Sequence, residues 1–153
     1  MISIIFELNG EMFSEKVEDN TTLFTLLKDY AKVNSIKTAC NQGDCGLCTV
    51  LLNDVPTKSC IVLASEADGG KVTTVEGLKD DPIAIVLRNS FAEHGAFQCG
   101  YCTPAFLLAA VALLRTKKNI TQDDVLEAIN GILCRCTGYQ QIIDGILAAS
   151  IKI

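Results

Sequence analysis

Cysteines are the residues of this chain whose number and spacing indicate chemistry. There are eight of them among 153 residues, far above an ordinary share. The N-terminal residues lack the basic and apolar regions of a signal peptide, so we expect the reducing cytoplasm, where such cysteines bind a metal or a redox cofactor more often than they form disulfides. They form two sets of four: the first cysteine set is Cys40, Cys45, Cys48 and Cys60, and the second cysteine set is Cys99, Cys102, Cys134 and Cys136.

The first cysteine set has the spacing C-x4-C-x2-C-x11-C, and its opening part is typical of plant-type [2Fe-2S] proteins. A sulfide-bridged cluster is anionic, and thiolates are the soft ligands that it requires. Gly43 and Gly46 can take positive φ and bring backbone N–H groups close to the sulfurs. The sequence therefore predicts an iron–sulfur site here, with both glycines lining it.

The second cysteine set consists of a C-x2-C pair and a C-x-C pair, each directly before a predicted helix. Helix N-termini carry positive partial charge and free N–H groups, so two of them would stabilise one anionic cluster. Two clusters of about -2 each would take the formal charge from -5 to about -9. Zinc is the alternative metal: the glycine-lined loop favours iron and sulfide at the first set, whereas spacing alone leaves zinc open at the second.

The first half of the chain is predicted to form a small mixed sheet of four or five strands crossed by one helix. Strands at residues 2–8 and 13–17 are joined through Asn9-Gly10, the strongest short hairpin signal. A helix follows the N-cap candidates at 19–22, with leucines at helical spacing. Further strands are predicted at 49–52, 58–63 and 71–75, with a turn at 53–56.

The second half is predicted to contain four helices and no strand. Pro82 begins the first and Gly95 ends it, whereas Thr103-Pro104 opens the second, whose run 105–114 is apolar on all sides and implies burial on all sides. A capping box at 121–124 opens the third, and Thr137-Gly138 opens the fourth. The residues expected to point inward from the fourth are Ile142, Ile143, Ile146, Leu147 and Ile151. The fold class is therefore α+β, with domains at residues 1–77 and 78–153.

Composition excludes several classes of function. The chain has 13 Lys and Arg against 18 Asp and Glu, and no basic stripe that would bind nucleic acid. Its longest apolar run, 105–114, is about half the roughly 20 residues that a membrane span requires. With a single histidine and no carboxylate pair near the cysteines, we expect no catalytic residue on this chain.

Three motifs resemble the small iron–sulfur subunit of the molybdenum hydroxylases, the xanthine dehydrogenase family. They are residues 37–50 (KTACNQGDCGLCTV), 95–104 (GAFQCGYCTP) and 133–139 (LCRCTGY), which occur in order and at family-like spacing. Ala39, Ala105 and Ile132 depart from the family pattern, but none of them is a candidate ligand.

The resemblance implies a β-grasp, plant-type ferredoxin-like domain that holds one [2Fe-2S] cluster through the first cysteine set. It also implies a four-helix bundle, with two-fold pseudo-symmetry, that holds a second cluster through the second set. Gln98 would hydrogen-bond the molybdopterin of a large subunit, and the region of Cys136 would approach it. Electrons would pass from that site through this chain to FAD on a medium subunit, within a hetero-oligomer for which a dimer of heterotrimers is one arrangement.

Purines and other N-heteroaromatics are the substrates that the resemblance favours. Aldehyde, carbon monoxide and aromatic-thioester enzymes are alternatives, as are a free-standing two-cluster electron carrier and a zinc-stabilised interaction module. We expect His94 to cap a helix end, in preference to acting as a ligand or proton shuttle. Tyr101 and Tyr139 are expected to shield the clusters from water, and Arg135 either tunes a cluster or lies on the surface.

Overall fold

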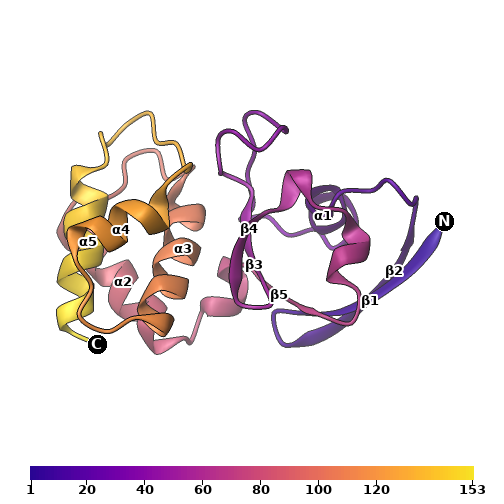
Figure 1. Ribbon diagram of the computed structural model, residues 1–153, viewed down its shortest axis with the longest axis horizontal. Coiled ribbons are helices and arrows are strands. Elements are labelled where there is room, and N and C mark those ends of the chain that lie inside the picture. The colour runs from indigo at the N-terminus through magenta and orange to yellow at the C-terminus, as the bar shows by residue number, and fades with distance from the viewer.

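The computed structural model describes all 153 residues and divides the chain into a sheet-containing half and a helical half (Figure 1). The first half contains strands β1 (Ile2–Leu8), β2 (Glu11–Val17), β3 (Thr49–Leu52), β4 (Val55–Lys58) and β5 (Lys71–Thr73). The second half contains helices α2 (Pro82–Glu93), α3 (Thr103–Thr116), α4 (Gln122–Ile129) and α5 (Gln140–Ile151). The α+β class predicted from the sequence is confirmed.

The five strands form one mixed sheet in the order β2-β1-β5-β3-β4. β1 and β2 are an antiparallel hairpin in which Leu8 faces Glu11 across the predicted Asn9-Gly10 turn. Both turn residues have positive φ, 53° and 91°, as a two-residue type I′ turn requires. β5 pairs in parallel with β1 and antiparallel with β3, so it joins the two hairpins at the centre of the sheet.

The strand predicted at 58–63 and the turn predicted at 53–56 are wrong. The turn consists of Asn53 and Asp54 alone, both with positive φ, and β4 follows at once, with Leu51 facing Pro56. β4 is an edge strand, where a proline costs no hydrogen bond within the sheet. After Lys58 the chain turns into a short 3₁₀ helix, Ser59–Ile61, which carries Cys60.

A compact core of 12 buried residues fills the sheet half. The short helix α1 (Leu23–Thr25) continues into a π-helical turn (Leu26–Tyr30), and its side chains cover one face of the sheet. The hydroxyl of Thr22 caps α1 by accepting the Thr25 N–H at 3.2 Å. The fully buried members of this core include Ile4, Phe6, Leu23, Leu26 and Leu27.

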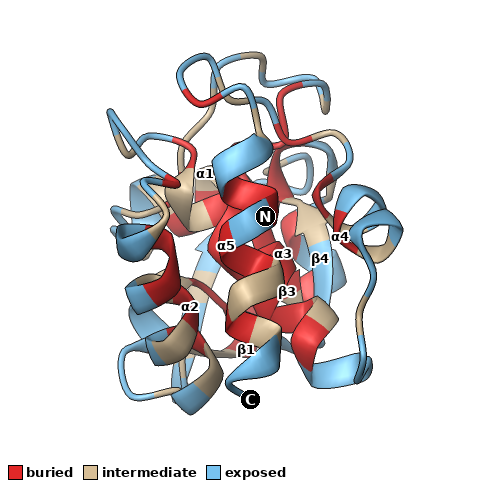
Figure 2. Cartoon of the chain, turned by 90° about the vertical axis from the view of Figure 1, so that its left-hand side faces the viewer, coloured by how far each residue is buried: buried red, intermediate tan, exposed pale blue.

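A larger core of 25 buried residues lies around α3, which is buried on nearly all sides as its sequence predicted (Figure 2). It includes Leu51 of β3 and Cys45 and Leu47 of the first cysteine loop as well as residues of all four long helices. The helical half is therefore packed directly onto the sheet half. None of the helices is both long and apolar enough to cross a lipid bilayer.

Two details of α5 differ from the prediction. The helix begins at Gln140 and not at Thr137, because Tyr139 adopts a left-handed backbone with φ 73° that helical geometry excludes. Ile151, expected to point inward, is 87% exposed and is the last residue of α5. Ile142, Ile143 and Ile146 are buried as expected.

Candidate metal centre

The first cysteine set is brought together by the β3–β4 hairpin. Cys48 lies directly before β3, and Cys60 lies two residues after the end of β4, in the 3₁₀ helix. Ser59 fixes this closure, because its N–H and its hydroxyl both donate to the Cys48 carbonyl oxygen, at 3.3 and 2.7 Å. Cys40 and Cys45 come from the irregular loop that precedes β3, so one short stretch and one hairpin supply all four sulfurs.

Backbone N–H groups converge on the sulfur of Cys40. Those of Gln42, Asp44 and Cys45 lie 3.5, 3.3 and 3.3 Å from it. The N–H of Cys45 and then that of Gln42 are the main reasons that the pKa of the Cys40 thiol falls to about 6. Gly43, with φ 87°, lies inside this turn, as the sequence predicted. The loop is therefore shaped to hold a thiolate, which is the form that binds metal.

The other sulfurs of the first set are buried. Cys45, Cys48 and Cys60 are 4%, 0% and 6% exposed. Burial, together with the adjacent thiol of Cys48, raises the pKa of Cys60 to about 11.

The second cysteine set comes from the two loops at one end of the helical half. Cys99 and Cys102 precede α3, and Cys134 and Cys136 lie between α4 and α5. The sulfurs of Cys99 and Cys136 are 3.7 Å apart. Two sulfurs on one tetrahedral ion, with metal–sulfur bonds of about 2.3 Å, lie about 3.8 Å apart. Burial, with the neighbouring thiol of Cys134, raises the pKa of Cys102 to about 12.

In the second set, the sulfurs of Cys99 and Cys136 therefore lie at the spacing of two ligands on one ion. Nowhere do three or more His, Cys, Asp or Glu side chains converge closely enough to hold a single ion. Each iron of a two-iron cluster takes two thiolate ligands, and backbone N–H groups stabilise the cluster's negative charge. The donor set and its backbone N–H groups thus fit two [2Fe-2S] clusters.

Cys134 has partners that the cysteine spacing did not reveal. Burial would raise its pKa, but hydrogen bonds from the hydroxyl and N–H of Thr137 outweigh burial and lower it. The Thr137 hydroxyl lies 3.1 Å from the sulfur. The repeated Cys-Thr pair, Cys102-Thr103 and Cys136-Thr137, is the sequence signal that points to this residue.

An exposed surface surrounds the second set. Cys99 and Cys136 are exposed, and so are Arg135 and Gln98, whose amide nitrogen donates to the Cys136 carbonyl oxygen at 3.3 Å. Three large apolar side chains are also exposed here: Phe97 (44%), Tyr101 (47%) and Leu133 (54%). We call these three the apolar rim. Large apolar side chains that are exposed beside such a site are typical of a surface that binds a partner.

The two cysteine loops touch each other. The N–H of Leu133 donates to the Cys45 carbonyl oxygen at 2.9 Å, and the hydroxyl of Tyr101 donates to the Thr38 carbonyl oxygen at 3.1 Å. Gly46, with φ 68°, lies so close to Gly131 that a side chain would overlap the Gly131 carbonyl oxygen. A mainly apolar cleft of about 390 Å³ lies between the sets, lined by Cys45 from the first and by Cys99, Cys102 and Cys134 from the second.

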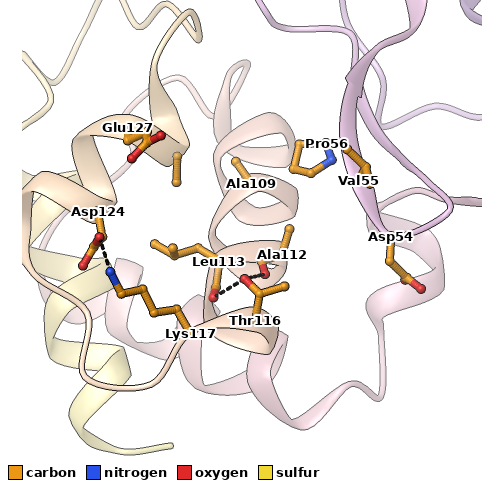
Figure 3. Close-up of a pocket in the computed structure, with 11 residues that line it drawn as sticks. Asp54, Val55, Pro56, Ala109, Ala112, Leu113, Thr116, Lys117, Asp124 and Glu127 are labelled. Atoms are coloured by element: carbon orange, nitrogen blue, oxygen red, sulfur yellow. Dashed lines mark hydrogen bonds and ion pairs between the residues drawn. The ribbon is translucent and has the colours of Figure 1, made fainter.

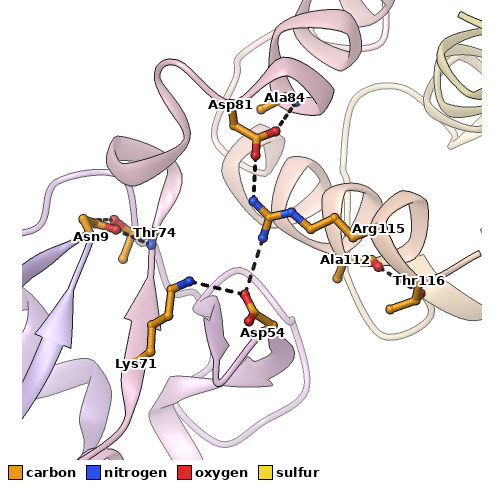
Figure 4. A network of polar contacts seen from close by, with 9 residues as sticks. All are labelled: Asn9, Asp54, Lys71, Thr74, Asp81, Ala84, Ala112, Arg115 and Thr116. Atoms are coloured by element: carbon orange, nitrogen blue, oxygen red, sulfur yellow. Dashed lines mark hydrogen bonds and ion pairs between the residues drawn. The ribbon is translucent and has the colours of Figure 1, made fainter. Parts of the chain in front are cut away.

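Other polar features lie away from the cysteines. A groove of about 440 Å³ runs between β4 and helices α3 and α4, and Asp124, one of the carboxylates that line it, is paired with Lys117 at 2.6 Å (Figure 3). Arg115 joins the two halves by bridging Asp81 at 2.7 Å and Asp54 at 3.5 Å (Figure 4). Nδ1 of His94 lies 2.8 Å from the Ser90 carbonyl oxygen, at the helix end where the sequence placed it.

Family comparisons cover both halves of the chain. Residues 6–78 match the 2Fe-2S iron-sulfur cluster binding domain, and residues 74–147 match the [2Fe-2S] binding domain.

Relatives of known identity resemble the whole chain. The nicotinate dehydrogenase small FeS subunit of Eubacterium barkeri is 43% identical over 141 residues, which is 92% of this chain and 90% of that protein. The crystal structure of quinoline 2-oxidoreductase from Pseudomonas putida 86 contains a chain that superposes with a TM-score of 0.88 at 39% identity, covering 95% of this chain and 90% of that one. The aldehyde oxidoreductase of Desulfovibrio desulfuricans ATCC 27774 superposes with a TM-score of 0.91 at 32% identity, covering 99% of this chain but 17% of that longer one.

Proposed function

Because the chain belongs to the family of small [2Fe-2S] subunits of molybdenum hydroxylases, we propose that each of its cysteine sets holds one [2Fe-2S] cluster. The ligands are Cys40, Cys45, Cys48 and Cys60 for the first cluster, and Cys99, Cys102, Cys134 and Cys136 for the second. The observations that carry this assignment are the three backbone N–H groups around the Cys40 sulfur and the 3.7 Å approach of the Cys99 and Cys136 sulfurs. Residues 1–77 then form a ferredoxin-like β-grasp domain, and residues 78–153 form a four-helix bundle.

The chain is the electron-transfer subunit of an oxidoreductase complex, and it carries no substrate chemistry. When bound, the clusters supply one-electron carriage between a molybdopterin site and FAD on partner chains. The protein's own residues stabilise the ligands and shield them from water. The N–H groups of the Cys40 loop stabilise thiolate charge, Gly43 and Gly46 let the backbone approach, and the burial of Cys45, Cys48 and Cys60 excludes water from the first site.

We assign the apolar rim and the exposed second set to the contact with a large molybdopterin-binding subunit. Gln98 lies at this surface. Its amide nitrogen donates to the Cys136 carbonyl oxygen, whereas its amide oxygen takes no part in that hydrogen bond. That oxygen and the Cys136 region are the groups we expect to face the pterin. A medium FAD-binding subunit would contact the sheet half, and the complex would be a hetero-oligomer in the cytoplasm.

The substrate of the complex is proposed to be an N-heteroaromatic compound. The relatives named for nicotinate and quinoline act on rings of this class, and they match almost the full length of this chain. An aldehyde substrate is the second candidate, because the chain resembles part of a longer aldehyde oxidoreductase. The pocket that decides between them belongs to the large subunit.

The experiment is anaerobic purification of the native complex from its own cells. We expect about four irons per copy of this chain, two iron–sulfur EPR signals, and co-purifying chains that contain molybdenum and flavin. Cys45→Ser should remove one signal, and Cys99→Ser should remove the other. Fewer than two signals in the unmodified protein, or a colourless protein that contains zinc, would overturn the proposal.

A further inference from the structure

Cys134 lies in a closed network of hydrogen bonds within residues 134–139. The Thr137 hydroxyl contacts the Cys134 sulfur at 3.1 Å, and the Thr137 N–H contacts the same sulfur at 3.4 Å. The Tyr139 N–H donates to the Thr137 hydroxyl at 3.3 Å, and the Cys134 N–H donates to the Tyr139 hydroxyl at 3.1 Å. Thr137 is only 7% exposed, so water competes little for its hydroxyl.

The direction of the Thr137 hydrogen bond follows from this network. A threonine hydroxyl has one proton to donate. Its oxygen accepts the Tyr139 N–H, so the proton remains available for the sulfur of Cys134. The Thr137 hydroxyl is thus a donor aimed at a proposed cluster ligand.

Tyr139 holds this arrangement at some cost to its own backbone. Its φ of 73° lies in the left-handed region, which bulky aromatic residues rarely adopt. Its ring packs edge-on against Phe106 of the buried α3, with ring centroids 6.2 Å apart. Such a backbone persists only where the surroundings fix it, and outliers of this kind cluster at functional sites.

The other half of the repeat lacks this network. Thr103 follows Cys102 as Thr137 follows Cys136, but the Thr103 hydroxyl is buried and has no hydrogen-bond partner. The two threonines occupy matching sequence positions, but only the Thr137 hydroxyl contacts a cysteine sulfur. Cys134 is singled out among the cysteines of the second set by a side-chain hydroxyl donor.

We propose that Thr137, positioned by Tyr139, sets the reduction potential of the cluster in the second cysteine set. The proposal rests on the proposed function, because it takes Cys134 as a ligand. Hydrogen bonds to the ligand sulfurs tune the potentials of iron–sulfur clusters, because they stabilise the more negative, reduced form. No bond breaks and no proton leaves Thr137: one electron is added to the cluster, and the hydroxyl stabilises the added charge.

The test is an EPR-monitored redox titration of the purified complex. Thr137→Val keeps the shape of the side chain and removes the hydroxyl, and Thr103→Val is the matched control. We expect Thr137→Val to make one of the two midpoint potentials more negative, with a loss of up to about tenfold in the equilibrium constant for reduction, which is 59 mV for one electron. The affected signal should be the one that Cys99→Ser removes. Thr103→Val should move neither potential, and Thr137→Ser should restore the original value.

The outcomes separate this inference from the proposed function. The role of Thr137 alone would be overturned if Thr137→Val kept both signals and changed the equilibrium constant for reduction by less than about twofold. An equal shift of the midpoint potential in Thr103→Val would also overturn it. Fewer than two signals in the unmodified protein would overturn both. Thr137→Ala provides the same measurement if the second methyl group of valine prevents cluster loading.

Discussion

The two cysteine sets hold the same number of sulfurs in opposite ways. The first is enclosed: three of its four cysteines are buried, and backbone N–H groups supply its hydrogen bonds. The second is open: Cys99 and Cys136 are exposed, and the side chain of Thr137 supplies the hydroxyl donor. The first site is enclosed by the chain itself, with Cys45 in the larger core around α3, whereas an open site with an apolar rim requires a partner to exclude water.

The loops of the two sets nevertheless depend on each other at Gly46, and this is where a substitution should have the largest effect. Gly46→Ala adds a Cβ that would overlap the Gly131 carbonyl oxygen and lie 2.9 Å from the Cα of Ile132, at a φ of 68°. We expect the free energy of unfolding to fall by about 3 kcal/mol or more, and iron to be lost from both sets. Thermal unfolding and iron analysis of the variant measure the two effects.

The control for this prediction is Gly69→Ala. Gly69 has the same φ of 68°, but a Cβ there would meet nothing within 4 Å. It should cost only the backbone strain, about 1 kcal/mol, and retain all iron. Equal losses in both variants would show that the contact between the two loops contributes nothing beyond strain.

Substituting one ligand from each set tests whether enclosure matters. Cys45→Ser and Cys99→Ser should each lower the iron content from about four to about two atoms per chain. Cys45 is 4% exposed within the larger core, so the serine hydroxyl is buried there and should cost about 2 kcal/mol of stability in addition. Cys99 is exposed, so its variant should lose iron with little further destabilisation. Chemical denaturation of the two cluster-depleted proteins compares these costs, and equal midpoints would contradict the difference between the sets.

The apolar rim gives the third comparison, because it borders the exposed cysteines of the second set. Phe97→Asp should weaken association with the large subunit by about tenfold or more, which is 1.4 kcal/mol, while both EPR signals remain. Val55→Asp on the edge strand β4 is the control, since Val55 is 60% exposed but lies away from the second set. Co-purification yields and binding titrations measure the loss. Normal association of the Phe97 variant would exclude the rim as the docking surface.

Local sequence patterns predicted most helices, strands and turns, but they did not predict the contacts between distant loops. The Asn9-Gly10 hairpin, the Thr121–Asp124 capping box and the burial of α3 follow from residue type and spacing, and all three are present. The approach of Gly46 to Gly131 and the bond from Leu133 to Cys45 join segments far apart in sequence, and no local pattern specifies them. The role of Tyr139 in the network around Cys134 was missed for a related reason, because no local pattern specifies its left-handed backbone or its contact with Phe106.

The smallest expected effect concerns Arg115, which joins the two halves of the chain through its ion pairs. Arg115→Gln removes the ion pairs with Asp81 at 2.7 Å and with Asp54 at 3.5 Å. It should lower the free energy of unfolding by only about 1 kcal/mol, because both pairs are partly exposed. Burial would raise the pKa of Asp81, but the Ala84 N–H and Arg115 outweigh it and hold that pKa below its usual 3.8. A carboxyl group with a lowered pKa stabilises the fold above its usual pKa and loses this contribution as the pH falls through the lowered value. The stability difference between the unmodified protein and Arg115→Gln should therefore be constant from about pH 6 to 8 and shrink below about pH 4. Urea denaturation across this range measures it, and a difference that grows in acid would show that Arg115 acts through a group other than a carboxylate.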